Sequence, residues 1–331
     1  MIKIIPDNVN INFIGQKNKV FILSFIVILV SMLSVLVTGL NYGIDFKGGY
    51  VVEARFPVEQ SLENLRQKFA ASSFGDFSLQ QLGKDGRDIV MKLQSTDTDT
   101  DAIADQPEDQ AGQTDSTEGN SRSENKVIEQ VKAVLGEGVV YRRIETIGPT
   151  VGAELIHNAI IAVVLSILAI AIYIAIRFEW QFAVCGMIAL AQDCIGVVGA
   201  YSLLKMEFNA SAIVAILTTA SYSVNDSIVI FDRIRENIKR HRKMPMPELI
   251  NRSINETLSR TVLTAGSTLL AVLALCLFGG EVISAFSTPI FIGISLGTFS
   301  SIALSAPLLL LFNLDRDKIA GTPKVVAGTA T

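Results

Sequence analysis

The stretch NASAIVAILTTASYSVNDSIVIFDRIREN, residues 209–237, decides the fold class of this chain. Residues 209–231 form an apolar run long enough to cross the hydrocarbon core of a bilayer, which takes about 20 residues of helix. Asn225 and Asp226 lie inside that run, and a dense charge cluster begins at Asp232. A carboxylate inside a span is costly and usually faces the interior of a helix bundle. The stretch therefore predicts one helix of a multi-helix membrane protein.

The composition of the whole chain supports a multi-spanning membrane protein. Of its 331 residues, 50% are hydrophobic and 18% are charged, and the mean hydropathy of +0.43 is high for a soluble domain. Six segments have the length and composition of spans, at residues 19–40, 157–176, 182–204, 209–231, 262–279 and 285–312. The first is too long for the apolar core of a signal peptide and no A-x-A site follows it, so we expect an uncleaved anchor.

Lysine and arginine near the spans predict their orientation, because positively charged loops stay in the cytoplasm. The loop from Asp232 to Arg260 carries eight Lys or Arg against four Asp or Glu, and both terminal segments, residues 1–18 and 313–331, are also basic near the spans. The loops on the other side hold only Lys205 with Glu207, and Glu281. Both termini are therefore predicted to be cytoplasmic.

This topology places residues 41–156 outside the cytoplasm as the one large extramembrane block. Alternating and helical apolar patterns predict strand, helix, two strands, helix and strand in that order. The order βαββαβ is typical of a ferredoxin-like α+β domain. Residues 95–125 interrupt it with nine acidic residues against one basic and no apolar periodicity, and we expect this insertion to be disordered.

The sequence offers little for an enzyme active site or a bound cofactor. No segment matches the P-loop pattern, and the only two histidines, His157 and His241, are predicted on opposite sides of the membrane. The three cysteines (Cys185, Cys194 and Cys276) lie in apolar runs without a CxxC spacing, so no metal site or disulfide is expected. Any work that the protein does is expected to draw on an ion gradient or a partner.

Ionisable and polar residues inside the spans are the candidate functional groups. Asp193 lies midway along span three, Asp226 and Asn225 lie in span four, and Arg260 begins span five. Thr219, Tyr222, Ser223 and Asp226 are predicted on one face of span four; Arg260, Thr264, Ser267 and Thr268 on one face of span five; and Gly293, Gly297 and Ser301 on a close-packing face of span six.

Two interpretations of these groups stay open from the residues alone. A buried aspartate that exchanges a proton next to an arginine is a workable proton relay. Alternatively, Asp226 and Asn225 only hydrogen-bond neighbouring helices. The structural interpretation is favoured more for Asp193, which has fewer polar neighbours in the sequence.

The chain resembles the SecD/SecF family of protein-export membrane proteins, within the resistance–nodulation–division superfamily. The resemblance rests on YGIDFKGG at 42–49, TIGPTVGAEL at 146–155, FEWQFAVCGMIALAQD at 178–193, SYSVNDSIVIFDRIREN at 221–237 and LSRTVLTAGSTLLAVLALCLFGGEVISAFS at 258–287. These matches follow the family order over residues 42–312. The family's span-four acid falls on Asp226 and its intramembrane arginine on Arg260. Its span-three acid falls on Asp193, where Gln192 replaces the usual histidine.

The resemblance implies a multi-pass subunit of the bacterial inner membrane with a periplasmic α+β domain. Its partners would be SecD, the SecYEG channel, often YajC and YidC, and preproteins in the periplasm, with no nucleic acid and no cofactor. Such a subunit is not an enzyme and uses the proton motive force to promote late translocation after the ATP-driven step of SecA. Two alternatives remain: a passive assembly factor of the translocase, and a small-molecule exporter of the same superfamily.

Overall fold

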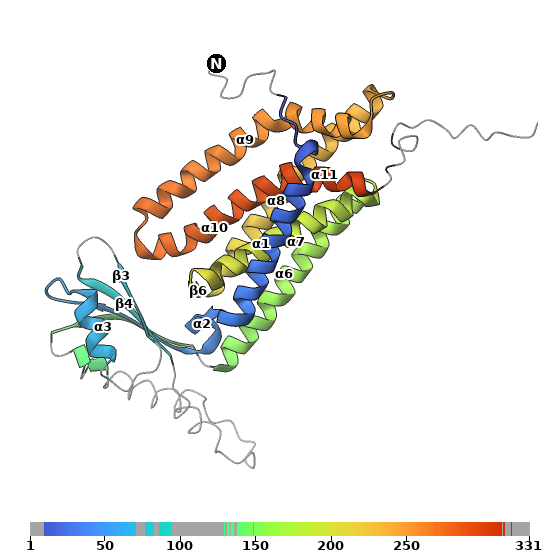
Figure 1. The fold of residues 1–331 in the computed structure, drawn as a ribbon. Helices are drawn as coiled ribbons and strands as arrows, with labels where there is room; N and C mark the ends of the chain where they lie inside the picture. The colour runs from blue at the N-terminus through green and yellow to red at the C-terminus, as the bar shows by residue number, and fades with distance from the viewer. Residues whose placement is uncertain are drawn as a thin grey trace, which may run out of the picture.

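The computed structural model describes residues 10–70, 77–82, 86–94, 138–147 and 149–312, together with residues 129, 131, 132, 134, 135, 314 and 319. Six long helices form a bundle with a small sheet domain at one end (Figure 1). The helices are α1 (Lys17–Thr38), α6 (Pro149–Arg177), α7 (Trp180–Leu203), α8 (Ala210–Arg240), α9 (Met246–Phe278) and α10 (Gly280–Ser300). All six have the length and hydropathy of membrane spans, as predicted. The acidic insertion 95–125 and most of residues 313–331 lie outside the described residues.

Helices α8 and α9 continue well beyond the predicted spans. At 1.5 Å per residue, the 31 residues of α8 cover about 46 Å, more than the hydrocarbon thickness of about 30 Å. The segment after Asp232, predicted as a loop, is therefore largely a helical hairpin. Its inner face is apolar, since Ile234 and Ile238 of α8 are buried with Ile250 and Ile254 of α9.

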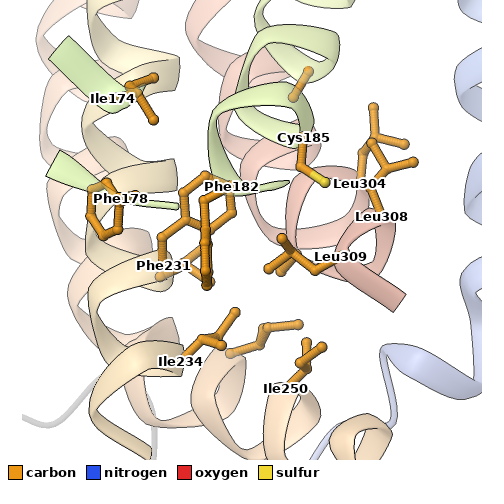
Figure 2. Packing of buried hydrophobic residues seen from close by; sticks show 14 of the residues in the cluster. Ile174, Phe178, Phe182, Cys185, Phe231, Ile234, Ile250, Leu304, Leu308 and Leu309 are labelled. Atoms are coloured by element: carbon orange, nitrogen blue, oxygen red, sulfur yellow. The ribbon is translucent and has the colours of Figure 1, made fainter. Parts of the chain in front are cut away.

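Aromatic packing fixes the same end of the bundle, as Figure 2 shows. The ring of Phe231 in α8 lies 5.3 Å from that of Phe182 in α7 and 6.1 Å from that of Phe178, in edge-to-face geometry. Phe182 and Phe231 are fully buried. Such pairs stabilise the packing beyond their buried area, so α7 and α8 are held together at this end.

The sheet domain contains β2 (Gly49–Arg55), α3 (Leu62–Ala70), β3 (Phe77–Leu82), β4 (Asp88–Gln94) and β5 (Val140–Ile147). The strands are antiparallel in the order β3-β4-β2-β5, which is the strand order of the predicted βαββαβ arrangement. Leu65 and Phe69 of α3 are buried against the sheet at the predicted helical spacing. The second predicted helix lies mostly outside the described residues, and it stays a prediction.

A short junction joins the sheet domain to the bundle and was not predicted. It consists of β1 (Asn41–Tyr42), α2 (Ile44–Lys47) and β6 (Glu207–Phe208), and β1 pairs in parallel with β6. Gly48 and Gly49 both have positive φ, +80° and +155°, where the chain turns from α2 into β2. The junction therefore lies at the base of the sheet, next to the start of α8.

The sixth span departs from a regular α-helix near its end. After α10, residues Ser301–Ser305 form a π-helical turn, followed by α11 (Ala306–Leu308) and a 3-10 turn at Leu309–Leu311. Pro307 has no N–H for the Ala303 carbonyl, and local π adjustment is a usual response to proline in a membrane helix. The change of helix type directly follows Ser300, which belongs to the site described next.

Candidate functional site

Asp193 lies where three helices of the bundle meet. It belongs to α7 and is fully buried. Its Oδ2 accepts hydrogen bonds from Ser223 Oγ of α8 at 2.5 Å and from Ser300 Oγ of α10 at 2.7 Å. Its Oδ1 is also buried, and no hydrogen bond reaches that atom from the part of the chain that the structure describes. One carboxylate thus connects α7, α8 and α10 inside the bundle.

The glycine face of α10 allows this close approach. A Cβ added at Gly297 would lie 3.1 Å from the Ser223 Cβ and 3.6 Å from Asp193 Oδ2. A Cβ added at Gly293 would overlap the Thr219 hydroxyl of α8. The predicted close-packing face of span six is confirmed, and its partner is the polar stripe of span four.

Asp193 has more polar neighbours in the structure than along the chain, because its partners come from other helices. Ser223 was noticed as part of span four, whereas Ser300 was missed. A detectable signal was its spacing, since Ser300 follows Gly293 by seven residues and Gly297 by three and so falls on the same side of the helix. Gln192, next to Asp193, is buried as well, and its Oε1 has no hydrogen-bond partner among the described residues.

Asp226 lies farther along α8 and differs from Asp193 in its surroundings. It is 9% exposed, and in the described parts of the chain no hydrogen bond or ion pair reaches its carboxylate. The charge that acts on it belongs to Arg260 of α9, which lies beyond ion-pair distance. The two residues that the sequence paired are therefore electrostatic neighbours without a direct contact.

The polar stripe of span four is narrower than predicted. Thr219, Ser223 and Asp226 are buried, whereas Tyr222, on the same face of the helix as predicted, is 41% exposed. Tyr222 lies 60° from Thr219 around the helix, whereas Thr219 and Ser223 lie against the glycines of α10. Asn225 is exposed on a different side of α8 from Asp226.

The hydroxyl groups of Thr264, Ser267 and Thr268 donate hydrogen bonds to carbonyl groups of their own helix, α9. Thr264 donates to the Arg260 carbonyl at 3.0 Å, and Ser267 and Thr268 donate to the Thr264 carbonyl at 2.9 and 3.1 Å. Arg260, Thr264 and Ser267 are exposed on the bundle surface. The predicted polar face of span five therefore exists, but its hydroxyls do not reach α8.

Asp193 and Asp226 thus offer two kinds of intramembrane carboxylate. The first accepts hydrogen bonds from two hydroxyl donors of neighbouring helices. The second has no hydrogen-bond donor among the described residues, and the charge of Arg260 acts on it from beyond ion-pair distance. A buried carboxylate without a hydrogen bond responds strongly to any change in the position of its counter-charge. No group of three or more His, Cys, Asp or Glu side chains with metal-site geometry occurs among the residues described.

The chain matches two family descriptions. "Protein export membrane protein SecD/SecF, C-terminal" matches residues 126–315, which include α6 to α10, and "SecD/SecF GG Motif" matches residues 33–56, which include the junction glycines. The protein translocase subunit SecF of Rickettsia felis is 40% identical over 94% of both chains, and that of Rickettsia prowazekii is 39% identical over the same shares.

Solved structures give the same result. The crystal structure of SecDF from Thermus thermophilus, a translocon-associated membrane protein, has a TM-score of 0.73 at 35% identity over 93% of this chain. A SecDF structure in a super-membrane-facing form has a TM-score of 0.67 at 34% identity over 98% of this chain. The chain spans 39% and 41% of those SecDF chains.

Proposed function

The chain belongs to the SecD/SecF family of protein-export membrane proteins, and from that premise we propose that it is a non-enzymatic translocase subunit driven by the proton motive force. Asp226 is the group that gains and loses a proton, and Arg260 is its counter-charge. Protonation of Asp226 changes how α8 interacts with its neighbours, and the resulting movement promotes late translocation of preproteins.

The observation that carries this proposal is the isolation of the Asp226 carboxylate. It is buried in a predicted span, and no hydrogen bond from the described residues fixes its charge. A carboxylate there is stable either as a neutral acid or with a cation close by. Because Arg260 of α9 is the charged neighbour of this carboxylate among the described residues, movement of α9 relative to α8 would favour one protonation state over the other.

Asp193 is assigned a different role in the same mechanism. Its two hydroxyl donors, Ser223 and Ser300, hold α7, α8 and α10 together through one carboxylate. Such a fixed network is suited to keeping the three helices in register while α9 changes position. Asp193 therefore supports the coupling site rather than exchanging the proton.

The exposed polar residues of α8 and α9 indicate a partner within the membrane. Asn225 and Arg260 lie on the surface of the isolated bundle at the depth of the spans, where contact with lipid is costly. We propose that a SecD partner covers this face. The SecDF relatives support the assignment, since this chain matches only about two-fifths of their length. Further contacts would be with SecYEG, and with YajC and YidC.

The proposed location is the bacterial inner membrane with both termini in the cytoplasm. Basic side chains support this orientation, because α1 begins at Lys17 and α6 ends at Arg177, and these helix ends lie away from the sheet domain (Figure 1). Arg233 of α8 follows Asp232, which pairs with Arg177 at the same end. The sheet domain is then periplasmic, on the side where translocating preproteins emerge.

The test is export in cells whose own copy of this subunit is depleted. Asp226→Asn keeps the size of the side chain but cannot exchange a proton, so export is expected to fall to the level of depleted cells. Asp232→Asn, at an exposed position of the same helix, is the matched control and should export normally. Unchanged export by Asp226→Asn at normal protein level contradicts the proposal and favours a passive assembly role.

A further inference from the structure

The helix that carries Asp226 begins at the junction with the sheet domain. The N–H of Ala210, the first residue of α8, donates to Asp45 Oδ2 at 3.0 Å. The N-cap Asn209 accepts from the Ser211 N–H at 3.1 Å. Carboxylates are favourable at a helix N-terminus, where backbone N–H groups lack partners inside the helix. Asp45, in the segment that follows α1, therefore holds the start of α8 in place.

An ion pair connects the segment that leads into α8 with an inner strand of the sheet. Lys92 Nζ of β4 lies 2.9 Å from Glu207 Oε1 of β6, and the two side chains are only 16% and 21% exposed. Glu207 is three residues before α8, and β4 is an inner strand of the sheet. Removing one member of a largely buried pair leaves the other charge unpaired, which is costly.

Gly43 provides the space for this ion pair. Its N–H donates to the Phe208 carbonyl at 2.9 Å, which places its Cα next to β6. A Cβ at this position would lie 2.7 Å from Glu207 Oε1 and 3.1 Å from Glu207 Cγ. A methyl group there would therefore push the Glu207 carboxylate away from Lys92.

A cleft of about 750 Å³ surrounds the ion pair on the side where the sheet faces the bundle. Its lining includes Val90 from β4, Tyr42 from β1 and Phe286 from α10. The sheet and the bundle also lie close together where β3 approaches α10 and where β4 approaches α2. The Lys92–Glu207 pair is therefore one of several contacts between them, and it reaches the segment that leads into α8.

We propose that the Lys92–Glu207 ion pair is the contact through which α8 positions the sheet domain. The inference rests on the proposed function, in which α8 moves when Asp226 changes its protonation. From Ala210 to Asp226 the helix is a stiff rod of about 24 Å at 1.5 Å per residue. When that rod shifts, Glu207 at its start moves with it, and the ion pair with Lys92 moves β4 in turn. Lys92 and Glu207 are positioning residues, and they exchange no proton.

The positioning role is tested first by a distance measurement that does not depend on export. Spin labels at Asn64→Cys in α3 and Leu203→Cys in α7, both exposed, report the distance between sheet domain and bundle in the full chain purified with SecD and reconstituted in lipid. The native cysteines (Cys185, Cys194 and Cys276) are first replaced by alanine. Lys92→Glu is expected to broaden the distance distribution, and the swap Lys92→Glu with Glu207→Lys is expected to narrow it again.

Lys68→Glu is the matched control, because it makes the same charge change at an exposed position of the same domain. It should leave the distribution unchanged. The inference is overturned if Lys92→Glu leaves the distance distribution unchanged, or if the distribution of the charge-swap variant is no narrower than those of the single variants.

An export assay then tests whether the Lys92–Glu207 ion pair is needed for translocation. Lys92→Glu, Glu207→Lys and Gly43→Ala should each lose export at normal protein level, and the charge swap should regain most of it. If both single charge variants export normally while Asp226→Asn loses export, the positioning role of the ion pair is wrong and the proposed function is unaffected. Normal export by Asp226→Asn refutes the proposed function itself, and the distance measurement still decides whether the ion pair positions the sheet.

Discussion

Removal of the Ser300 hydroxyl tests whether Asp193 holds three helices together. In Ser300→Ala the carboxylate keeps its bond from Ser223 but loses the donor from α10. Alanine fits the same position without a clash, so the lost hydrogen bond is the main change. The variant should therefore be folded and measurably less stable.

The size of the effect depends on the charge of the acceptor. Hydrogen bonds to charged groups contribute about 1.5–3 kcal/mol to stability, whereas hydrogen bonds between membrane helices average about 0.6 kcal/mol in double-mutant cycles. The Ser34–Ser202 bond between α1 and α7, at 2.8 Å, is a buried neutral pair of the same protein and provides the comparison. At alkaline pH, where Asp193 is ionised, the coupling energy of Ser300 with Asp193 should exceed that of Ser34 with Ser202 by about 1 kcal/mol or more.

The assay is reversible unfolding in mixed detergent micelles as the denaturing detergent is increased. Two cycles are measured, one with Ser300→Ala and Asp193→Ala and one with Ser34→Ala and Ser202→Ala, each with its double variant. A Ser300–Asp193 coupling no larger than the Ser34–Ser202 coupling would show that the Asp193 carboxylate contributes no more than an ordinary hydroxyl and does not hold the three helices together.

Two further changes probe the packing and the charged hairpin. Gly293→Ala places a methyl group onto the Thr219 hydroxyl and should lower the free energy of unfolding by about 1–3 kcal/mol. Gly266→Ala is the control, because open space surrounds it, and it should be neutral or stabilising by up to about 1 kcal/mol. Equal effects of the two variants would contradict the contact between α10 and α8. Glu256→Gln weakens the 2.7 Å contact with Arg233 between α9 and α8 and should lower the free energy of unfolding by no more than about 1 kcal/mol at low salt. This loss of stability should shrink at ~1 M salt, because salt screens exposed charges. A loss that does not depend on salt would mean that packing rather than charge is responsible.

The spans were predictable because a bilayer imposes a length and a composition on every helix that crosses it. The sheet order was predictable in part, since the alternation of buried residues in β2 and β4 is a local signal. The helical extension after Asp232 was not, because its apolar face is formed by Ile234 and Ile238 among many charges, and a hydropathy window averages these together.

The candidate site was predictable residue by residue but not as a contact network. Asp193 and Asp226 are recognisable from the cost of a carboxylate in a span. Which of them is hydrogen-bonded depends on the rotation of α7, α8 and α10 about their axes, and only the packed bundle fixes those angles. The junction was missed for a related reason: β1 and β6 are two residues each, too short for any periodic pattern.

Coupling of the proton motive force to export through Asp226 is tested by comparing the wild type with Asp226→Asn in an export assay with and without a membrane potential. The wild type should export faster when the potential is present, and Asp226→Asn should export at one rate in both conditions, at normal protein level. An equal response of the two proteins to the potential would contradict the account.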